Sequence, residues 1–76
     1  MIKEHDSIVL NTDLLSAGLV AGDVGVVVHV YEERKAFEVE FIAFDGNTVA
    51  VETLDAEKVR PIRPREMPHV RNMVAA

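Results

Sequence analysis

The side chains best suited to chemistry in this 76-residue sequence are carboxylates on two neighbouring predicted strands. Glu38 and Glu40 alternate with apolar residues in the strand predicted at 37–42, and Glu52 lies in the strand predicted at 48–54. A period of two places Glu38 and Glu40 on the same face of a strand. Paired carboxylates can hydrolyse glycosides, but that reaction needs a cleft that a barrel of this size hardly provides. The pattern therefore favours an acidic surface over a catalytic pair.

The three histidines do not have the spacing of a metal site. His5, His29 and His69 form no HxH or HExxH motif, and the chain has no cysteine to supply a thiolate. We therefore expect no metal and no cofactor. On the outer face of the sheet we expect His29 to lie opposite Glu38, which would favour the protonated imidazole. The candidate partner-binding residues are Glu38, Glu40, Glu52 and His29.

Other catalytic signatures are also absent from the sequence. Gly18, Gly22 and Gly25 match neither a dinucleotide-binding nor a phosphate-binding glycine loop. Ser7 and Ser16 do not lie in a nucleophile elbow. We therefore expect no catalytic residues and no enzymatic activity.

Charge is distributed unevenly along the chain. Residues 1–57 hold three basic and twelve acidic residues, a net charge of −9, and residues 58–76 hold five basic and one acidic, a net charge of +4. The acidic body disfavours nonspecific binding of nucleic acid, because that affinity comes mainly from neutralising phosphates. The basic segment could contact phosphate or an acidic surface, or fold back on the acidic body. The candidate nucleic-acid-binding residues of the alternative function are Arg60, Arg63, Arg65 and Arg71.

Short β-strands are the elements that must position these side chains. The valines at alternate positions of 24–30 favour a pleated strand, and Gly22 and Gly25 can take the positive φ of a sharp turn before it. Residues 11–21 form a long loop whose apolar residues should wrap over the core. The other predicted elements are strands at 7–10, 37–42, 48–54 and 59–62, a helical turn at 55–58 that Asp55 can cap, and an extended or short-helical tail with its helix near 69–75.

The register of the two hairpins follows from the expected core. If Phe41 and Val51 both face inward, they lie opposite each other, which requires a three-residue loop at 45–47 with Asn47 in the left-handed region. A two-residue turn would mix core-facing and solvent-facing residues. The other predicted pairs are Val30 with Phe37, Val28 with Val39, His29 with Glu38, and Glu40 with Glu52.

Several stretches of the sequence are similar to a known fold. They comprise Leu19, Gly22, Asp23, Gly25, Val27 and Val28, the hairpin at Tyr31, Glu38-Val39-Glu40-Phe41, and the ending from Leu54 to Arg60-Pro61. Over about residues 2–62 the chain resembles an SH3-like barrel of the KOW type and, more closely, a family of small bacterial proteins of unknown function. The resemblance implies an all-β, five-stranded SH3-like barrel at 1–62, followed by a basic C-terminal tail at 63–76. It implies no catalytic residues, and the acidic loops differ from the basic loops of RNA-binding KOW relatives.

These features predict a non-catalytic protein–protein interaction module. Its contact region would be the acidic face or the loop at 11–21, and one specific form is an accessory or antitoxin-like partner of a neighbouring gene product. The alternative is a KOW-like nucleic-acid-binding protein that uses the basic C-terminal segment. Self-association through edge strands, or through the apolar residues Val70, Met73 and Val74, is a further expectation. The sequence has no apolar run of about 20 residues and no signal-peptide pattern, so we expect no membrane association and a cytoplasmic location.

Overall fold

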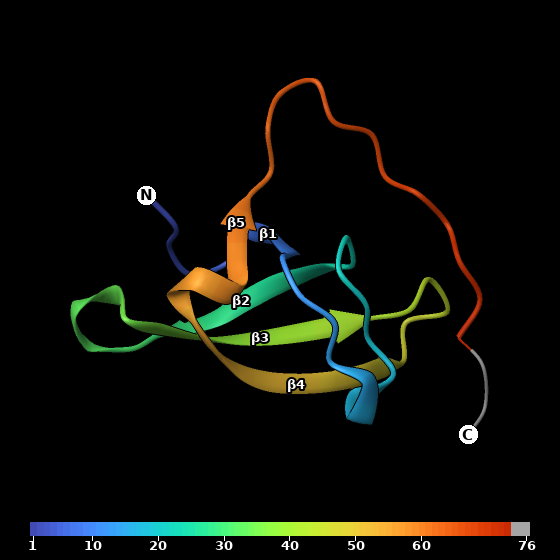
Figure 1. The fold of residues 1–76 in the computed structure, drawn as a ribbon, viewed down its shortest axis with the longest axis horizontal. Helices are drawn as coiled ribbons and strands as arrows, with labels where there is room; N and C mark the ends of the chain where they lie inside the picture. Colours follow the sequence, from blue (N-terminus) through green and yellow to red (C-terminus); the bar gives the residue numbers. More distant parts are fainter. Residues whose placement is uncertain (74–76) are drawn as a thin grey trace.

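The fold is one antiparallel sheet of five strands. The computed structural model describes residues 1–73, and its strand order is β4-β3-β2-β1-β5. Figure 1 shows β2, β3 and β4 side by side, with β5 inclined steeply to them. The elements are β1 (Ser7–Leu10), η1 (Leu15–Ala17), β2 (Val24–Val30), η2 (Glu32–Arg34), β3 (Ala36–Ile42), β4 (Thr48–Asp55), η3 (Ala56–Lys58) and β5 (Val59–Pro61), where η denotes a 3₁₀ turn.

The predicted all-β class, with five strands and a 3₁₀ turn before the last, is confirmed. Pro61 ends β5, which in the part of the chain that the structure describes pairs only with β1, at one edge of the sheet, as expected for a strand with proline. Asp55 precedes η3, but its side chain makes no capping hydrogen bond, contrary to expectation. No helix in residues 1–73 is long and apolar enough to cross a membrane.

The inward row of β3 supplies more of the buried core than any other strand. Phe37, Val39 and Phe41 alternate along this strand and are at most 3% exposed, as predicted. Leu19, from the loop at 11–21, is buried against them, so this loop does wrap over the core. The remaining buried members of the cluster are Ile8, Leu10, Val27, Leu54 and Val59.

A β-bulge exchanges the two faces of β2 halfway along the strand. Val27 lies opposite Val39, and His29 lies opposite Glu38, the next residue back along β3, so Val28 has no partner of its own. Val27 is therefore fully buried, whereas Val28 is 41% exposed. The predicted pairing of Val28 with Val39 is wrong, because strict alternation does not allow for an extra residue. Two predicted pairs are confirmed, Val30 with Phe37 and His29 with Glu38.

Gly25 is required by core packing. A Cβ at this position would lie 2.6 Å from Cγ1 of Val39 and 2.9 Å from Cε1 of Phe41. The missing side chain lets these two core residues pack directly against the backbone of β2. Of the two glycines expected to supply positive φ before β2, Gly22 does so, with φ 97°, whereas Gly25 serves to admit the side chains of β3.

The hairpin between β3 and β4 has a different register from the predicted one. Phe41 lies opposite Ala50, and the pairing shifts at the end of β3 so that Val49 is left without a partner. Gly46, with φ 90°, takes the left-handed conformation that was predicted for Asn47. The N–H of Ala43 donates to the carbonyl of Asn47, and the N–H of Gly46 donates to the carbonyl of Ala43, so the three-residue loop lies at 44–46, one residue earlier than predicted. The prediction of Phe41 opposite Val51 is therefore wrong, because the shifted loop and the bulge at Val49 together set the register.

Candidate functional site

The predicted acidic residues do not form one face. Glu38 and Glu40 lie on the outer face of β3, as expected. Glu52 lies opposite the buried Val39, so its side chain points to the core side of the sheet. The predicted opposition of Glu40 and Glu52 is wrong, because a shift of one residue in register moves a side chain to the other face.

Hydroxyl groups hold both outer glutamates in place. The Oγ1 of Thr53 and the hydroxyl of Tyr31 donate to Oε1 of Glu38, at 2.5 Å and 3.2 Å. The Oγ1 of Thr48 donates to Oε2 of Glu40 at 2.6 Å. These cross-strand hydrogen bonds satisfy part of the acceptor capacity of each carboxylate and offset the cost of two like charges on one strand face.

The carboxylate nearest to His29 belongs to the N-terminal segment. Its Nδ1 lies 3.7 Å from Oε2 of Glu4, and its ring packs edge-on against Tyr31 with ring centroids 4.6 Å apart. The predicted pairing of His29 with Glu38 therefore holds for the backbone register, while the carboxylate near the imidazole is that of Glu4. The contact between His29 and Glu4 depends on the path of the chain before β1, which alternation in the strands does not predict.

Residues 62–73 form a strap that leaves the sheet after β5, arches outward and returns to the body (Figure 1). One foot of the strap is the pair Arg60–Glu66, whose hydrogen bonds from Nη1 and Nη2 to the two carboxylate oxygens measure 2.8 Å and 2.5 Å. The backbone N–H of Arg63 donates to the same carboxylate at 2.7 Å. The hydrogen bonds from Arg60 and then from the Arg63 backbone lower the pKa of Glu66 to about 2.

The other foot joins the strap to the turn before β2. Arg71 donates from Nε and Nη2 to the two carboxylate oxygens of Asp23, at 2.8 Å and 2.5 Å, and from Nη2 to the carbonyl of Gly18 at 3.0 Å. Partial burial raises the pKa of Asp23, but the hydrogen bonds from Arg71 and from the Val20 backbone outweigh it, so the pKa is lowered overall. The charge pattern left open whether the basic tail contacts phosphate or another acidic surface, or folds back on the acidic body. In the structure the tail folds back on the body.

The strap has no helix in the residues that the structure describes. The short helix predicted near 69–75 is therefore absent over 69–73, and the rest of that prediction lies outside the described residues, as does Val74. Pro64 and Pro68 lack a backbone N–H and disfavour a helix, and the strap contains only a turn at Pro64 and Arg65, where the N–H of Glu66 donates to the carbonyl of Arg63 at 3.1 Å.

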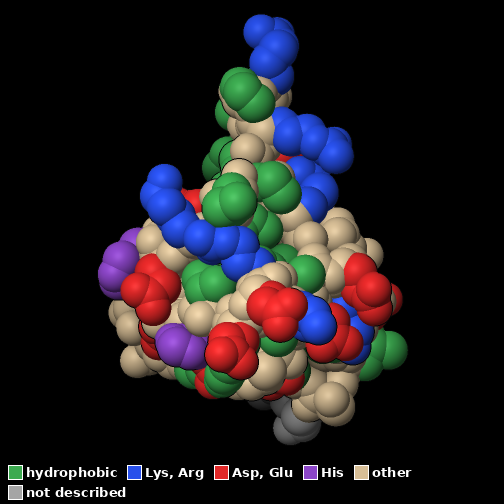
Figure 2. All heavy atoms as spheres, turned by 90° about the vertical axis from the view of Figure 1, so that its left-hand side faces the viewer, with side chains coloured by type: hydrophobic (Ala, Val, Ile, Leu, Met, Phe, Trp, Pro, Cys, Tyr) green, Lys and Arg blue, Asp and Glu red, His purple; other side chains and the backbone are tan. Residues whose placement is uncertain are grey.

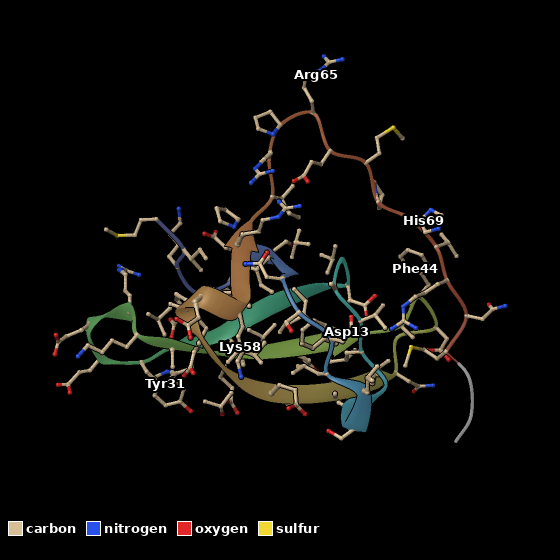
Figure 3. The ribbon with its side chains drawn as sticks, viewed as in Figure 1. Asp13, Tyr31, Phe44, Lys58, Arg65 and His69 are labelled. Carbon is tan, nitrogen blue, oxygen red and sulfur yellow. The ribbon has the colours of Figure 1, made fainter. Side chains whose placement is uncertain are left out.

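Between its feet the strap spans an apolar cleft of about 690 Å³, at the end of the sheet where β2 begins and β3 ends. Met67 and Val70 of the strap line this cleft yet remain 87% and 69% exposed. Figure 3 shows Phe44 and His69 on this side of the molecule, with Arg65 at the apex of the strap. The exposed large hydrophobic residues that line the cleft are Val24, Ile42 and Phe44 from the body, and Ile62, Met67, Val70 and Met73 from the strap.

Sequence reasoning missed this cleft although it noticed some of its residues. The apolar residues of the tail were visible as a group around Val70 and Met73, but nothing local shows which surface they meet. The bulge in β2 also turns Val24 outward, against the inward direction that alternation suggested. The cleft lies between the strap and the sheet, so its position depends on the path of both segments and not on a local sequence pattern.

Two of the four candidate nucleic-acid-binding arginines are already paired with carboxylates. Arg60 and Arg71 belong to the two feet of the strap. Arg63 and Arg65 make no ion pair with any residue of 1–73. Figure 2 shows the basic side chains following the strap, above a body with acidic side chains. Ion pairing leaves fewer basic charges for phosphate than the sequence offers.

The comparisons with known proteins point to one family. The model of DUF4926, described as a domain of unknown function, matches residues 4–61. This match covers the five-stranded sheet and ends where the strap begins. The curated proteins and the solved structures gave no match. The chain therefore belongs to the DUF4926 family of domains of unknown function.

Proposed function

We propose that this protein is a non-catalytic protein-binding module and that the cleft beneath the strap takes an apolar segment of a partner protein. The observation that carries this proposal is the gathering of exposed apolar side chains, from the sheet and from the strap, around one cleft. Contiguous exposed apolar surface on a small protein commonly marks an interaction site. The cleft volume also falls within the range of about 300–1,000 Å³ of small-ligand sites.

The charges around the cleft indicate the chemistry of the partner segment. Asp23 and Glu66 line the cleft but are paired with the arginines of the two feet. Glu40 also lines the cleft and makes no ion pair with a basic residue of 1–73. A partner segment that sets a lysine or arginine beside its apolar residues complements this rim. An accessory or antitoxin-like role beside a neighbouring gene product is a specific form of the proposal.

The alternative, a KOW-like nucleic-acid-binding protein, has weaker support. It relies on the basic C-terminal segment, where Arg60 and Arg71 are engaged in ion pairs. Arg63 and Arg65 would supply at most about two phosphate contacts, which gives a shallow salt dependence. RNA or DNA binding that disappears in a variant with Arg63→Ala and Arg65→Ala would support this alternative.

The test is affinity capture with the tagged full chain from cells that carry the gene, followed by titration with the purified captured protein. Phe44→Ser and Met67→Ser each remove an exposed apolar side chain from the cleft, so folding should be unaffected. Leu15→Ser is the matched control, because Leu15 is 74% exposed but lies outside the cleft. We expect both cleft variants to weaken binding about tenfold or more, as central contacts of an interface do, and the control to bind normally. Equal binding by all four proteins would rule out the cleft.

A further inference from the structure

The two edges of the sheet differ greatly in length. β5 closes one edge with three residues and ends at Pro61. β4 forms the other edge with eight residues, none of them proline, and within residues 1–73 it pairs only with β3. An unpaired edge presents a row of backbone donors and acceptors to any other strand. β4 is therefore the edge at which a further strand can be added.

The hydrogen-bonding pattern shows which residues of β4 face this free edge. The N–H of Ala56 donates to the carbonyl of Lys35 at 2.9 Å, which makes these two residues a hydrogen-bonded pair of the β3–β4 ladder. Such pairs alternate with pairs whose backbone groups point away. Val51, Thr53 and Asp55 belong to the second kind, so their N–H and C=O groups point outward. None of their N–H groups donates to another element within residues 1–73.

Glu52 lies between these outward-facing positions and is the one charged residue of β4 on the core side of the sheet. It is half-buried opposite Val39. Its carboxylate makes no salt bridge with residues 1–73. Inward-pointing charges on an edge strand are one of the devices that prevent edges from pairing with copies of themselves.

The geometry of a symmetric pairing explains how Glu52 would act. Several antiparallel registers of two β4 copies satisfy the outward backbone groups, and the one centred on Glu52 pairs Val51 of each copy with Thr53 of the other. That register sets Glu52 of one copy directly opposite Glu52 of the second copy, with Cα atoms about 4.5 Å apart in a non-hydrogen-bonded pair. Like charges at that spacing repel, whereas an opposite charge there attracts.

We propose that the edge of β4 accepts an extended strand of a partner protein that carries a lysine or arginine opposite Glu52, and that Glu52 excludes a second copy of this chain. The same carboxylate then attracts the basic partner strand and repels a second copy of this chain. Specific interfaces often combine attraction of the correct partner with repulsion of the wrong one. This inference does not rest on the cleft, because Val51, Thr53 and Asp55 do not line it.

The test uses the chain itself as the basic strand. Unlabelled Glu52→Lys protein is added at millimolar concentration and low ionic strength to ¹⁵N-labelled wild-type protein. We expect the amide signals of Val51, Thr53 and Asp55 to shift, and the amide hydrogens of these residues to exchange more slowly. Sedimentation should show a dimer in the mixture and not in either protein by itself. Glu57→Lys is the matched control, since Glu57 is exposed on η3 and the variant changes net charge equally. Absence of these shifts, or equal shifts with the control, would overturn the proposal.

A second variant tests the exclusion of like copies without adding a positive charge. Glu52→Thr removes the carboxylate and retains a residue that favours strands. We expect this variant to self-associate at concentrations where wild-type protein sediments as a monomer. If Glu52→Thr remains monomeric, or if wild-type protein already pairs through β4, Glu52 does not exclude a second copy.

Discussion

Arg71 donates two hydrogen bonds to the carboxylate of Asp23, a residue 48 positions earlier in the chain. This pair attaches the strap to the end of the sheet. A further hydrogen bond from Nη2 of Arg71 to the carbonyl of Gly18 restricts the orientation of the guanidinium group. Bidentate, charge-assisted pairs are among the stronger polar contacts that a protein surface offers. The strap from 67 onward therefore depends on this one contact more than on its own backbone.

We predict that Arg71→Ala releases the second half of the strap. The heteronuclear ¹⁵N NOE of residues 67–73 should fall toward values of a flexible chain, because no backbone hydrogen bond ties these residues to the sheet. Residues 62–66 should keep their order through the Arg60–Glu66 pair. Arg65→Ala is the control, because Arg65 makes no ion pair within 1–73. This variant should leave the ¹⁵N NOE unchanged in both halves of the strap. Unchanged order at 67–73 in Arg71→Ala would contradict the role of this contact.

The pH dependence of the first foot follows from the lowered pKa of Glu66. Its pKa falls from the usual 4.5 to about 2, so the folded state binds the proton less tightly than the unfolded chain. The stabilising contribution is therefore complete above pH 4.5 and is lost as pH falls through about 2. A ¹³C titration of the carboxyl should give a midpoint near 2, rising toward 4.5 in Arg60→Gln. A wild-type midpoint at 4.5 would show that the pair does not persist in solution.

Gly25→Ala should destabilise the fold. The new methyl group would overlap the buried side chains of Val39 and Phe41, at 2.6 Å and 2.9 Å. Overpacking of this kind costs about 1–3 kcal/mol, which urea denaturation can measure. Val28→Ala is the control, because Val28 is an exposed bulge residue, and its effect should stay within about 0.5 kcal/mol. Equal stability of Gly25→Ala and wild type would show that β2 can move away from β3 without cost.

The hairpin variants separate the observed register from the predicted one. Gly46→Ala places a side chain at φ 90° with no atom within 4 Å, so any loss of stability comes from backbone strain. We expect a loss of about 1–2 kcal/mol. Asn47→Ala should cost less, since Asn47 does not take positive φ and only its exposed side-chain bond to Asp45 is lost. The opposite order of the two effects in thermal denaturation would favour the predicted loop at 45–47, with Asn47 in the left-handed region.

The positions of the strands could be predicted from the sequence because period-two alternation and strand propensity are local properties. The inward row of β3 and the extent of β1 follow from this pattern. Pro61 likewise fixed its strand at an edge through the chemistry of one residue. The acidic character of the body and the basic character of the tail were equally visible.

Tertiary structure alone decided which face each side chain occupies after a bulge. The extra residues at Val28 and Val49 are settled by how β2, β3 and β4 pack together, and each reverses the alternation on one side of it. Glu52 thereby moves to the core side of an edge strand. Such a shift depends on contacts between strands, which no local pattern contains.

The sequence by itself determined an all-β sheet, its core strand and a tail of opposite charge. The tertiary structure decided where that tail lands, because the contact of Arg71 with Asp23 joins residues 48 positions apart and depends on the path of the chain between them. It also decided that the exposed apolar residues of tail and sheet face one cleft. Local propensities act over a few residues, whereas these contacts are selected by the packing of the whole chain.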